Sequence, residues 1–189
     1  AAYAQLHFST DMSEPARGRF LQFIQERNNA IFTETLFFTL ELNRLDDEVL
    51  DRQLAHPAAA RYAPWIWDNR VFRPHQLSDD LEALLHEKSV TGRSAWIRLF
   101  EQSIARMRFA VDGQELPLAD VLNMMSHNDG DRRRAAAKSL GQEFGEQIEL
   151  FTLITNTLAK DKEIEDRWRH YPTPVSYRNL ANRVEDEVV

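Results

Sequence analysis

Apolar residues recur at steps of three and four along two long stretches of this chain, which is the spacing of one face of an α-helix. The first stretch runs from about residue 13 to 45 and the second from 131 to 171. The apolar positions of the second are Leu140, Phe144, Ile148, Phe151, Ile154 and Leu158. No proline interrupts this stretch before Pro172, so it predicts one unbroken helix of about 60 Å. Such a helix would be a spine along which the first long helix packs.

The ends of the two long helices carry their own signals. Ser13 is the expected N-cap of the first, and Asp129 that of the second. Residues 3–11 are predicted as an irregular or extended lead-in. Around residues 36–42 apolar side chains occupy nearly every face, which predicts burial on several sides. Towards its end the second helix turns polar, with i,i+4 pairs expected at Glu163–Arg167 and Glu165–Arg169.

Shorter helices are predicted between the two long ones. Capping signals, prolines and apolar spacing place them at about residues 46–54, 58–73, 79–90, 93–107 and 118–125. Asp79 and Glu82 have the spacing of a capping box, which makes Asp79 an expected N-cap.

One strand signal lies at residues 108–116. Residues 108–111 and 114–116 flank Asp112-Gly113, a dipeptide suited to a type I′ turn because both central residues need positive φ. An isolated hairpin is marginal in water, so it should lie against helices. The predicted fold class is mainly α: an elongated multi-helix bundle with long helices and one short β-hairpin near 108–116. Because no repeat or Gly/Ser linker divides the chain, residues 1–189 are predicted to form a single helical domain.

Composition narrows the class of protein. With 43% hydrophobic and 28% charged residues over 189 positions, the chain has the profile of a globular protein with a real core. It has no apolar run of membrane-spanning length, and its net charge of −7 argues against nucleic acid as a partner. The absence of cysteine excludes disulfides, thiolate metal sites and a cysteine nucleophile. We therefore expect a cytoplasmic protein that binds neither membrane nor nucleic acid.

Candidate chemistry is sparse. The closest approach to a metal motif is His86-Glu87, but the second histidine would have to occupy position 90, which is Val90. The histidines, interpreted as surface or capping residues, are His7, His56, His75, His86, His127 and His170. Trp65 and Trp67 could stack on a ligand, although aromatic residues at a helix junction more often fill a core. The residue pattern assigns no catalytic or metal-binding residue and leaves substrate-binding residues unknown.

Three segments together carry a resemblance to a known family. They read LFFTLELNR at 36–44, HEKSVTGR at 86–93 with Trp96 and Leu99-Phe100 after it, and FTLITNTLAKDK at 151–162 with Tyr171-Pro172 after it. In order and spacing they resemble the N-terminal half of the oligoendopeptidase F family of zinc metallopeptidases, which is related to thimet oligopeptidase. The resemblance covers most of the chain from about residue 11 onward.

The resemblance implies a largely helical protein with a deep channel between two halves, which admits short peptides and excludes folded proteins. It also implies catalysis by one zinc ion bound by an H-E-x-x-H helix and a further glutamate, the motif's own glutamate activating water. Those parts belong to the C-terminal half of the family, and this sequence contains none of them. The chain is therefore expected to be an inactive fragment without a cofactor, while its parent enzyme uses zinc.

Two functions stay open from the sequence. The first is a non-catalytic channel-wall domain whose partners are short peptides and the catalytic domain of the same chain. The second is a stand-alone module that binds a partner helix through the apolar surface around Trp65 and Trp67. The non-methionine start and the acidic-then-apolar end favour the first. In that case apolar surface would be exposed, and self-association is expected.

Overall fold

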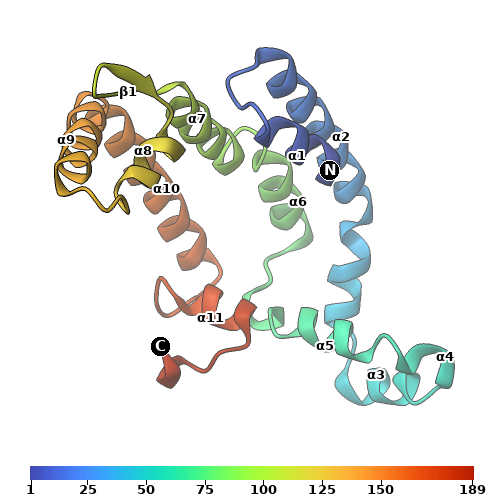
Figure 1. Cartoon of the computed structure of the whole chain (residues 1–189). Helices are drawn as coiled ribbons and strands as arrows, with labels where there is room; N and C mark the ends of the chain where they lie inside the picture. The colour runs from blue at the N-terminus through green and yellow to red at the C-terminus, as the bar shows by residue number, and fades with distance from the viewer. The chain divides into compact units, whose positions relative to one another are not determined.

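The computed structural model describes all 189 residues and consists mainly of helices (Figure 1). The α-helices are α1 (Ala2–Ser9), α2 (Pro15–Arg44), α3 (Asp47–Leu54), α4 (Pro57–Ala60), α5 (Ala63–Arg70), α6 (Asp79–Lys88), α7 (Arg93–Arg106), α8 (Leu118–Met124), α9 (Gly130–Glu146), α10 (Ile148–Trp168) and α11 (Ser176–Asn182). Two 3₁₀ turns, η1 (Arg73–His75) and η2 (Asp186–Val188), and the strands β1 (Phe109–Val111) and β2 (Gln114–Leu116) complete the chain. The predicted mainly-α class with one short hairpin is confirmed. None of the helices is long and apolar enough to cross a membrane.

The chain divides into two compact units. Unit 1 contains residues 1–26 and 90–159, and unit 2 contains residues 27–89 and 160–189. Helices α2 and α10 each contribute residues to both. Since the units are built from interleaved segments, no single cut of the chain would separate them. The single domain predicted for residues 1–189 stays a prediction.

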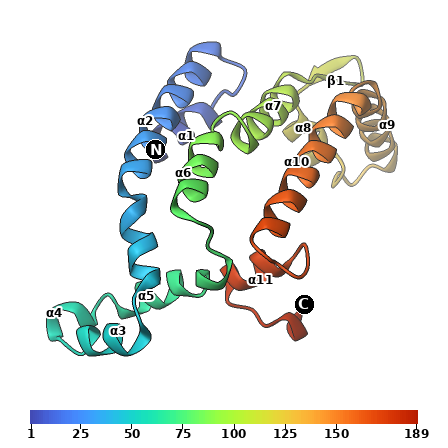
Figure 2. The same ribbon diagram turned by 180° about the vertical axis from the view of Figure 1, so that it is seen from behind.

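The hairpin and the helices beside it form the larger core of unit 1. Strand β1 pairs antiparallel with β2 in the register Phe109↔Leu116, and the turn residues Asp112 and Gly113 have φ of 51° and 78° as the type I′ prediction requires. Phe109 is fully buried and contacts Val121 of α8 and other buried residues of that core. Both ribbon views place the hairpin next to α8 and α9 (Figure 1 and Figure 2). The hairpin therefore lies against helices, as its marginal stability demands.

The start of the chain is helical, so the predicted irregular lead-in at residues 3–11 is wrong. Helix α1 buries Ala4 and Phe8, which are one helical turn apart, against Leu21 of α2. No side chain caps α1, so no local signal marks its start. The burial of Phe8 against α2 therefore explains why α1 forms although no local sequence signal predicts it.

The predicted unbroken helix over 131–171 is also wrong, because it is two helices. Gln147 leaves helical dihedrals, with φ −102° and ψ 10°, and separates α9 from α10. Gly141 and Gly145 lie in the last turns of α9, where glycine weakens the preference for helix and makes a break less costly. The 60 Å spine therefore does not exist, and the first residues of α2 pack on α1 instead. The N-cap expected at Asp129 is confirmed, since its carboxylate accepts from the amide of Asp131 at 2.9 Å.

Unit 2 has its own small core, built from Leu42, Leu50, Leu54 and Ile66. Its anchor is Arg70, whose buried guanidinium donates to the carbonyl oxygens of Leu42 and Leu45 at 2.5 and 2.8 Å. Leu42 lies in the last turn of α2 and Leu45 directly follows the helix, so Arg70 acts as a C-cap from α5.

Two of the shorter helices differ from their predictions. The helix predicted at 58–73 is divided into α4, α5 and η1. The N-cap of α6 is Ser78 rather than Asp79. Glu82 nevertheless reaches back to the start of the helix, accepting from the amide of Leu77 at 2.8 Å.

Candidate functional site

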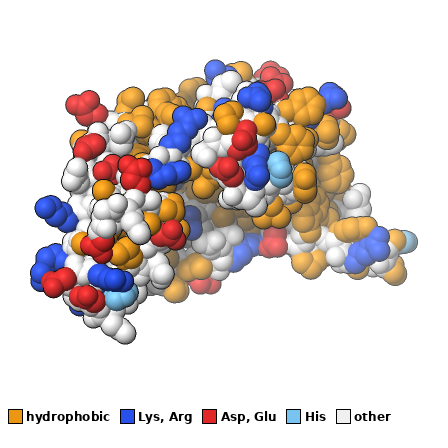
Figure 3. All heavy atoms as spheres, turned by 45° about the horizontal axis from the view of Figure 1, so that its top comes forward, with side chains coloured by type: hydrophobic (Ala, Val, Ile, Leu, Met, Phe, Trp, Pro, Cys, Tyr) orange, Lys and Arg blue, Asp and Glu red, His pale blue; other side chains and the backbone are white.

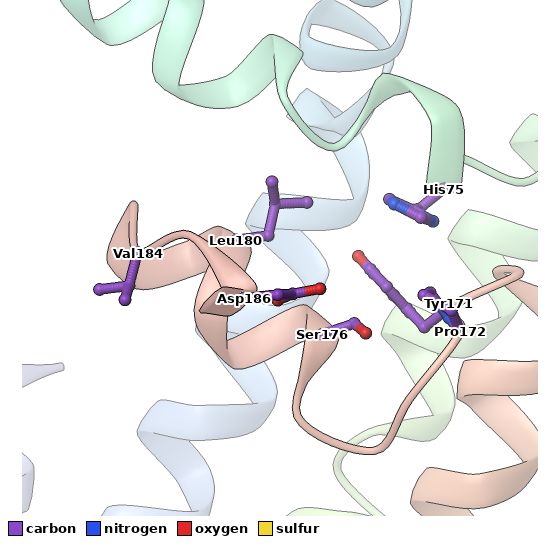
Figure 4. A pocket seen from close by; sticks show the side chains of 7 residues that line it. All are labelled: His75, Tyr171, Pro172, Ser176, Leu180, Val184 and Asp186. Carbon is purple, nitrogen blue, oxygen red and sulfur yellow. The ribbon is translucent and has the colours of Figure 1, made fainter. Parts of the chain in front are cut away.

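A pocket with a volume of about 200 Å³ lies within unit 2 (Figure 4). We call it the His75 pocket. It is lined by His75, Tyr171, Pro172, Ser176, Leu180, Val184 and Asp186. Thus η1 contributes one wall, and the segment from the end of α10 to η2 contributes the rest.

Two left-handed residues fold the second segment around the pocket. His170 and Arg183 have φ of 58° and 56°, and each follows the end of a helix. After His170 the amide of Tyr171 donates back to the carbonyl of Asp166 at 2.9 Å, which satisfies a terminal carbonyl of α10. Pro172 then prevents the helix from continuing. These turns bring Tyr171 and η2 to the same side as His75.

His75 and Tyr171 form the centre of the pocket. Their rings stack at a centroid distance of 3.9 Å and an interplanar angle of 21°. Nδ1 of His75 lies 2.8 Å from the carbonyl oxygen of Arg169. Because a carbonyl oxygen only accepts, Nδ1 donates in this contact, and Nε2 is the ring nitrogen left for a further partner.

The Tyr171 hydroxyl stays protonated at neutral pH. Burial raises the pKa of Tyr171 to about 12; Arg169 opposes this rise, and Tyr177 and the carboxylates of Asp166 and Glu165 add to it. Figure 4 shows this hydroxyl pointing into the space between His75, Leu180 and Asp186.

Asp186 is the acidic group of the pocket. One oxygen of its carboxylate accepts from the side-chain amide of Asn179 at 2.9 Å. Asn179 is buried in α11, so it fixes the carboxylate from behind. Asp186 is exposed, and its second carboxylate oxygen has no partner within the chain.

An ion-pair network supports the pocket. The guanidinium of Arg169 makes a bidentate pair with Glu82 at 2.7 and 2.9 Å, and its Nε donates to Glu165 at 2.8 Å. Arg169 also donates to the carbonyl of His75 at 3.2 Å, so the network holds η1 against the end of α10. Burial would raise the pKa of Glu82, but the hydrogen bonds from Arg169 and Leu77 hold it below its usual value. The pKa of Arg169 is raised, mainly by Glu82.

The two predicted i,i+4 pairs are confirmed. Glu165–Arg169 belongs to this network, whereas Glu163–Arg167 is an exposed pair at 3.6 Å.

The histidines serve different purposes. Nδ1 of His56 caps α4 by accepting from Ala58 at 3.2 Å, and Nδ1 of His127 accepts from Asp129 at 3.0 Å, which agrees with their interpretation as capping residues. His75 is the one that sequence reasoning missed as a pocket residue, because it lies 96 positions from Tyr171 and no spacing rule links them.

The structure brings together no group of three or more His, Cys, Asp or Glu side chains that could hold a metal ion. His86 lies beside Phe32 at a ring distance of 6.3 Å, and its Nε2 is buried without a hydrogen bond. The zinc ion that the resemblance implies for the parent enzyme thus has no fitting ligand set in these residues.

Trp65 and Trp67 are not core residues, so their interpretation as core filling is wrong. They are 48% and 36% exposed, and Trp65 stacks on Phe38 of α2 at 6.4 Å. Phe37 and Phe38 are 57% and 54% exposed, so the burial on several sides predicted around residues 36–42 is wrong as well. The helix buries Leu40 and Leu42 there and leaves its aromatic residues at the surface.

Comparison with known proteins gives these features a context. Residues 41–109 match the N-terminal M3 peptidase family described as Oligopeptidase F. The structure is similar to oligoendopeptidase-F from Enterococcus faecium, with a TM-score of 0.84 at 18% sequence identity over 99% of this chain and 38% of that one. It is also similar to a proposed peptidase from Chlamydophila abortus, with a TM-score of 0.64 at 16% identity over 99% of this chain and 32% of that one. A search of curated proteins finds no match.

This chain thus spans about a third of the length of the solved proteins that it matches. The resemblance expected from the sequence is confirmed: residues 41–109 match the oligopeptidase F family, and the chain as a whole has the fold of an N-terminal portion of an oligoendopeptidase F-like peptidase.

Proposed function

We propose that this chain is the non-catalytic, channel-wall part of a zinc metalloendopeptidase that cleaves short peptides. The proposal is carried by the structural similarity to oligoendopeptidase-F, which extends over 99% of this chain but only 38% of the peptidase. In such an enzyme this part would shape access to the active site, while the remaining part would supply the zinc ligands and the residues that activate water. The cytoplasmic location predicted from composition stays a prediction.

The large exposed surface of this chain supports a domain that other domains of a longer protein would cover. The chain exposes 13,197 Å². Two separate compact domains of half its mass would together expose about 11,000 Å². The difference, about 2,000 Å², exceeds the roughly 800 Å² that one partner contributes to a typical protein interface. Much of the surface seen in Figure 3 is hydrophobic, and α2 and α5 expose several aromatic residues.

Hydrolysis of a fluorescence-quenched oligopeptide tests the proposal. The 189-residue chain with added zinc should show no turnover, whereas a longer protein containing this sequence and the zinc domain should cleave the peptide. The same peptide sequence inside a folded protein should resist cleavage, since a channel excludes it. Zinc-dependent turnover by the chain alone, or cleavage of both substrates by the longer protein at equal rates, contradicts the proposal.

A second candidate function rests on the exposed Phe38–Trp65 pair. A stand-alone interaction module would use this surface to bind a partner helix, because exposed aromatic patches are typical of interfaces. Either function predicts that the isolated chain self-associates. Sedimentation velocity should show a dimer or larger species that the double variant Phe38→Ser, Trp65→Ser reduces, and a monomer at all concentrations would count against this prediction.

A further inference from the structure

Three polar groups converge in the His75 pocket and lack partners. The contact of His75 with Arg169 uses Nδ1, and Nε2 makes no hydrogen bond. The Tyr171 hydroxyl makes none, and one carboxylate oxygen of Asp186 is free once Asn179 occupies the other. They come from η1, the loop after α10 and η2, so the fold rather than one local turn brings them together. A concave site with a few convergent polar groups is the usual form of a small-ligand site.

The chemistry of these groups selects the ligand. A carboxylate only accepts hydrogen bonds, and in the tautomer that donates from Nδ1 the Nε2 atom of His75 accepts as well. The Tyr171 hydroxyl can accept as well. A ligand that donates several hydrogen bonds from one centre can therefore satisfy all three. A primary ammonium group does this with three N–H donors and no acceptor.

The charges around the pocket also favour a positively charged ligand. The one cationic side chain close to Tyr171 is Arg169, and its charge is balanced by Glu82 and Glu165. Asp186 is the carboxylate that lines the pocket without a cationic partner. A cation entering here therefore meets a net negative site, and an anion would be repelled.

The walls limit the size of the ligand. Leu180, Val184 and Pro172 provide apolar surface beside the polar groups. The volume of about 200 Å³ lies below the 300 Å³ or more typical of drug-sized pockets, so the group that binds here is small.

We propose that the His75 pocket binds a primary alkylammonium group, with Asp186 as its counter-ion, His75 and Tyr171 as further acceptors, and Leu180 and Val184 around the alkyl stem. The ammonium group can belong to a lysine side chain or to the amino terminus of a peptide. This binding is a property of the 189-residue chain and does not require the rest of a peptidase, so it stands or falls separately from the proposed function.

Titrations followed by ¹H–¹⁵N correlation spectra of the chain test this. The probes are Nα-acetyl-lysine amide, which carries a side-chain ammonium; leucine amide, which carries an α-ammonium; and Nα-acetyl-norleucine amide, which is uncharged. At least one charged probe should shift the amides of Tyr171, Ser176 and Asp186 saturably, with a dissociation constant of about 1 mM. The charged probe that binds more tightly identifies the source of the ammonium group. The neutral probe should not cause these shifts, and equal shifts with all three probes, or with none, overturn the proposal.

Two variants assign the binding to the pocket. Asp186→Asn removes the counter-ion but keeps an oxygen for Asn179, and it should weaken binding about tenfold or more. Glu187→Gln removes the same charge one residue away, outside the pocket lining, and should leave the affinity unchanged. Tyr171→Phe keeps the stacked ring and should weaken binding several-fold. Correlation spectra of the free variants establish that each is folded. Equal affinity of Asp186→Asn and Glu187→Gln contradicts the assignment.

Discussion

Replacing Arg169 with methionine should destabilise unit 2 far more than removing the exposed charge of Arg167, two residues earlier in the chain. Arg169 and Glu82 are only 17% and 13% exposed, and two hydrogen bonds join them. Arg169→Met leaves Glu82 charged in a mostly buried position with only the Leu77 amide as partner. Hydrogen bonds to charged groups contribute about 1.5–3 kcal/mol each. Breaking a buried ion pair from one side costs about 3–5 kcal/mol. We expect a loss of about 3 kcal/mol, since both groups keep some contact with water.

Urea unfolding followed by tryptophan fluorescence measures this loss. Trp65, Trp67 and Trp168 report on unit 2. The matched control is Arg167→Met, which removes an equal charge from an exposed pair in the last turns of α10, two residues before Arg169, and should give no measurable change.

A double-mutant cycle with Glu82→Gln isolates the pair. The coupling energy should be about 1–3 kcal/mol, because each single variant leaves the other partner unsatisfied. If Arg169→Met behaves like Arg167→Met, or if the two substitutions at Glu82 and Arg169 are additive, the ion pair does not stabilise unit 2 and the reasoning is refuted.

Three further predictions concern titration and backbone geometry. The lowered pKa of Glu82 means that its ion pair stabilises the fold above about pH 4.5 and loses this effect as the pH falls through the folded-state pKa. The stability difference between wild type and Glu82→Gln should therefore shrink on acidification, and a constant difference from pH 7 to pH 3 would contradict this. The raised pKa of Tyr171, about 12, predicts a late step in the tyrosinate absorbance that Tyr171→Phe removes, with stability lost as the pH rises from about 10 to 12. Gly113→Ala should destabilise unit 1 by about 1 kcal/mol because φ is +78° in the hairpin turn. Gly141→Ala, in helix α9 with open space around it, should stabilise unit 1 by about 0.5–1 kcal/mol. Thermal melts that show the same sign for both alanine variants would refute this pair of predictions.

Local signals predicted the parts of the fold that local chemistry decides. Asp112-Gly113 predicted the hairpin because few other dipeptides accept two positive φ values. Asp129 predicted the start of α9 because its carboxylate caps a free amide. Where tertiary contacts determine the structure, the local sequence gave no signal or a wrong prediction. Helix α1 exists because Phe8 is buried against α2, and the break at Gln147 carries no proline to mark it.

The candidate site could not have been predicted from spacing at all. His75 and Tyr171 are 96 positions apart, and Glu82 and Arg169 are 87 apart. Each of these residues alone resembles an ordinary surface histidine, tyrosine or charge. The i,i+4 pair of Arg169 with Glu165 was predicted, but its stronger pair with Glu82 depends on a turn between α10 and α11 that only the folded chain reveals.

The interleaving of the two units sets the order in which the chain can fold during synthesis. Residues 1–26 belong to a unit whose remaining residues, 90–159, are made only after a segment of the other unit has emerged. At about 5–20 residues per second, the first helices wait several seconds or longer for their partners. Unit 2 is completed last, because Arg169 must leave the ribosome before it can pair with Glu82. Neither unit can therefore finish folding before most of the chain exists.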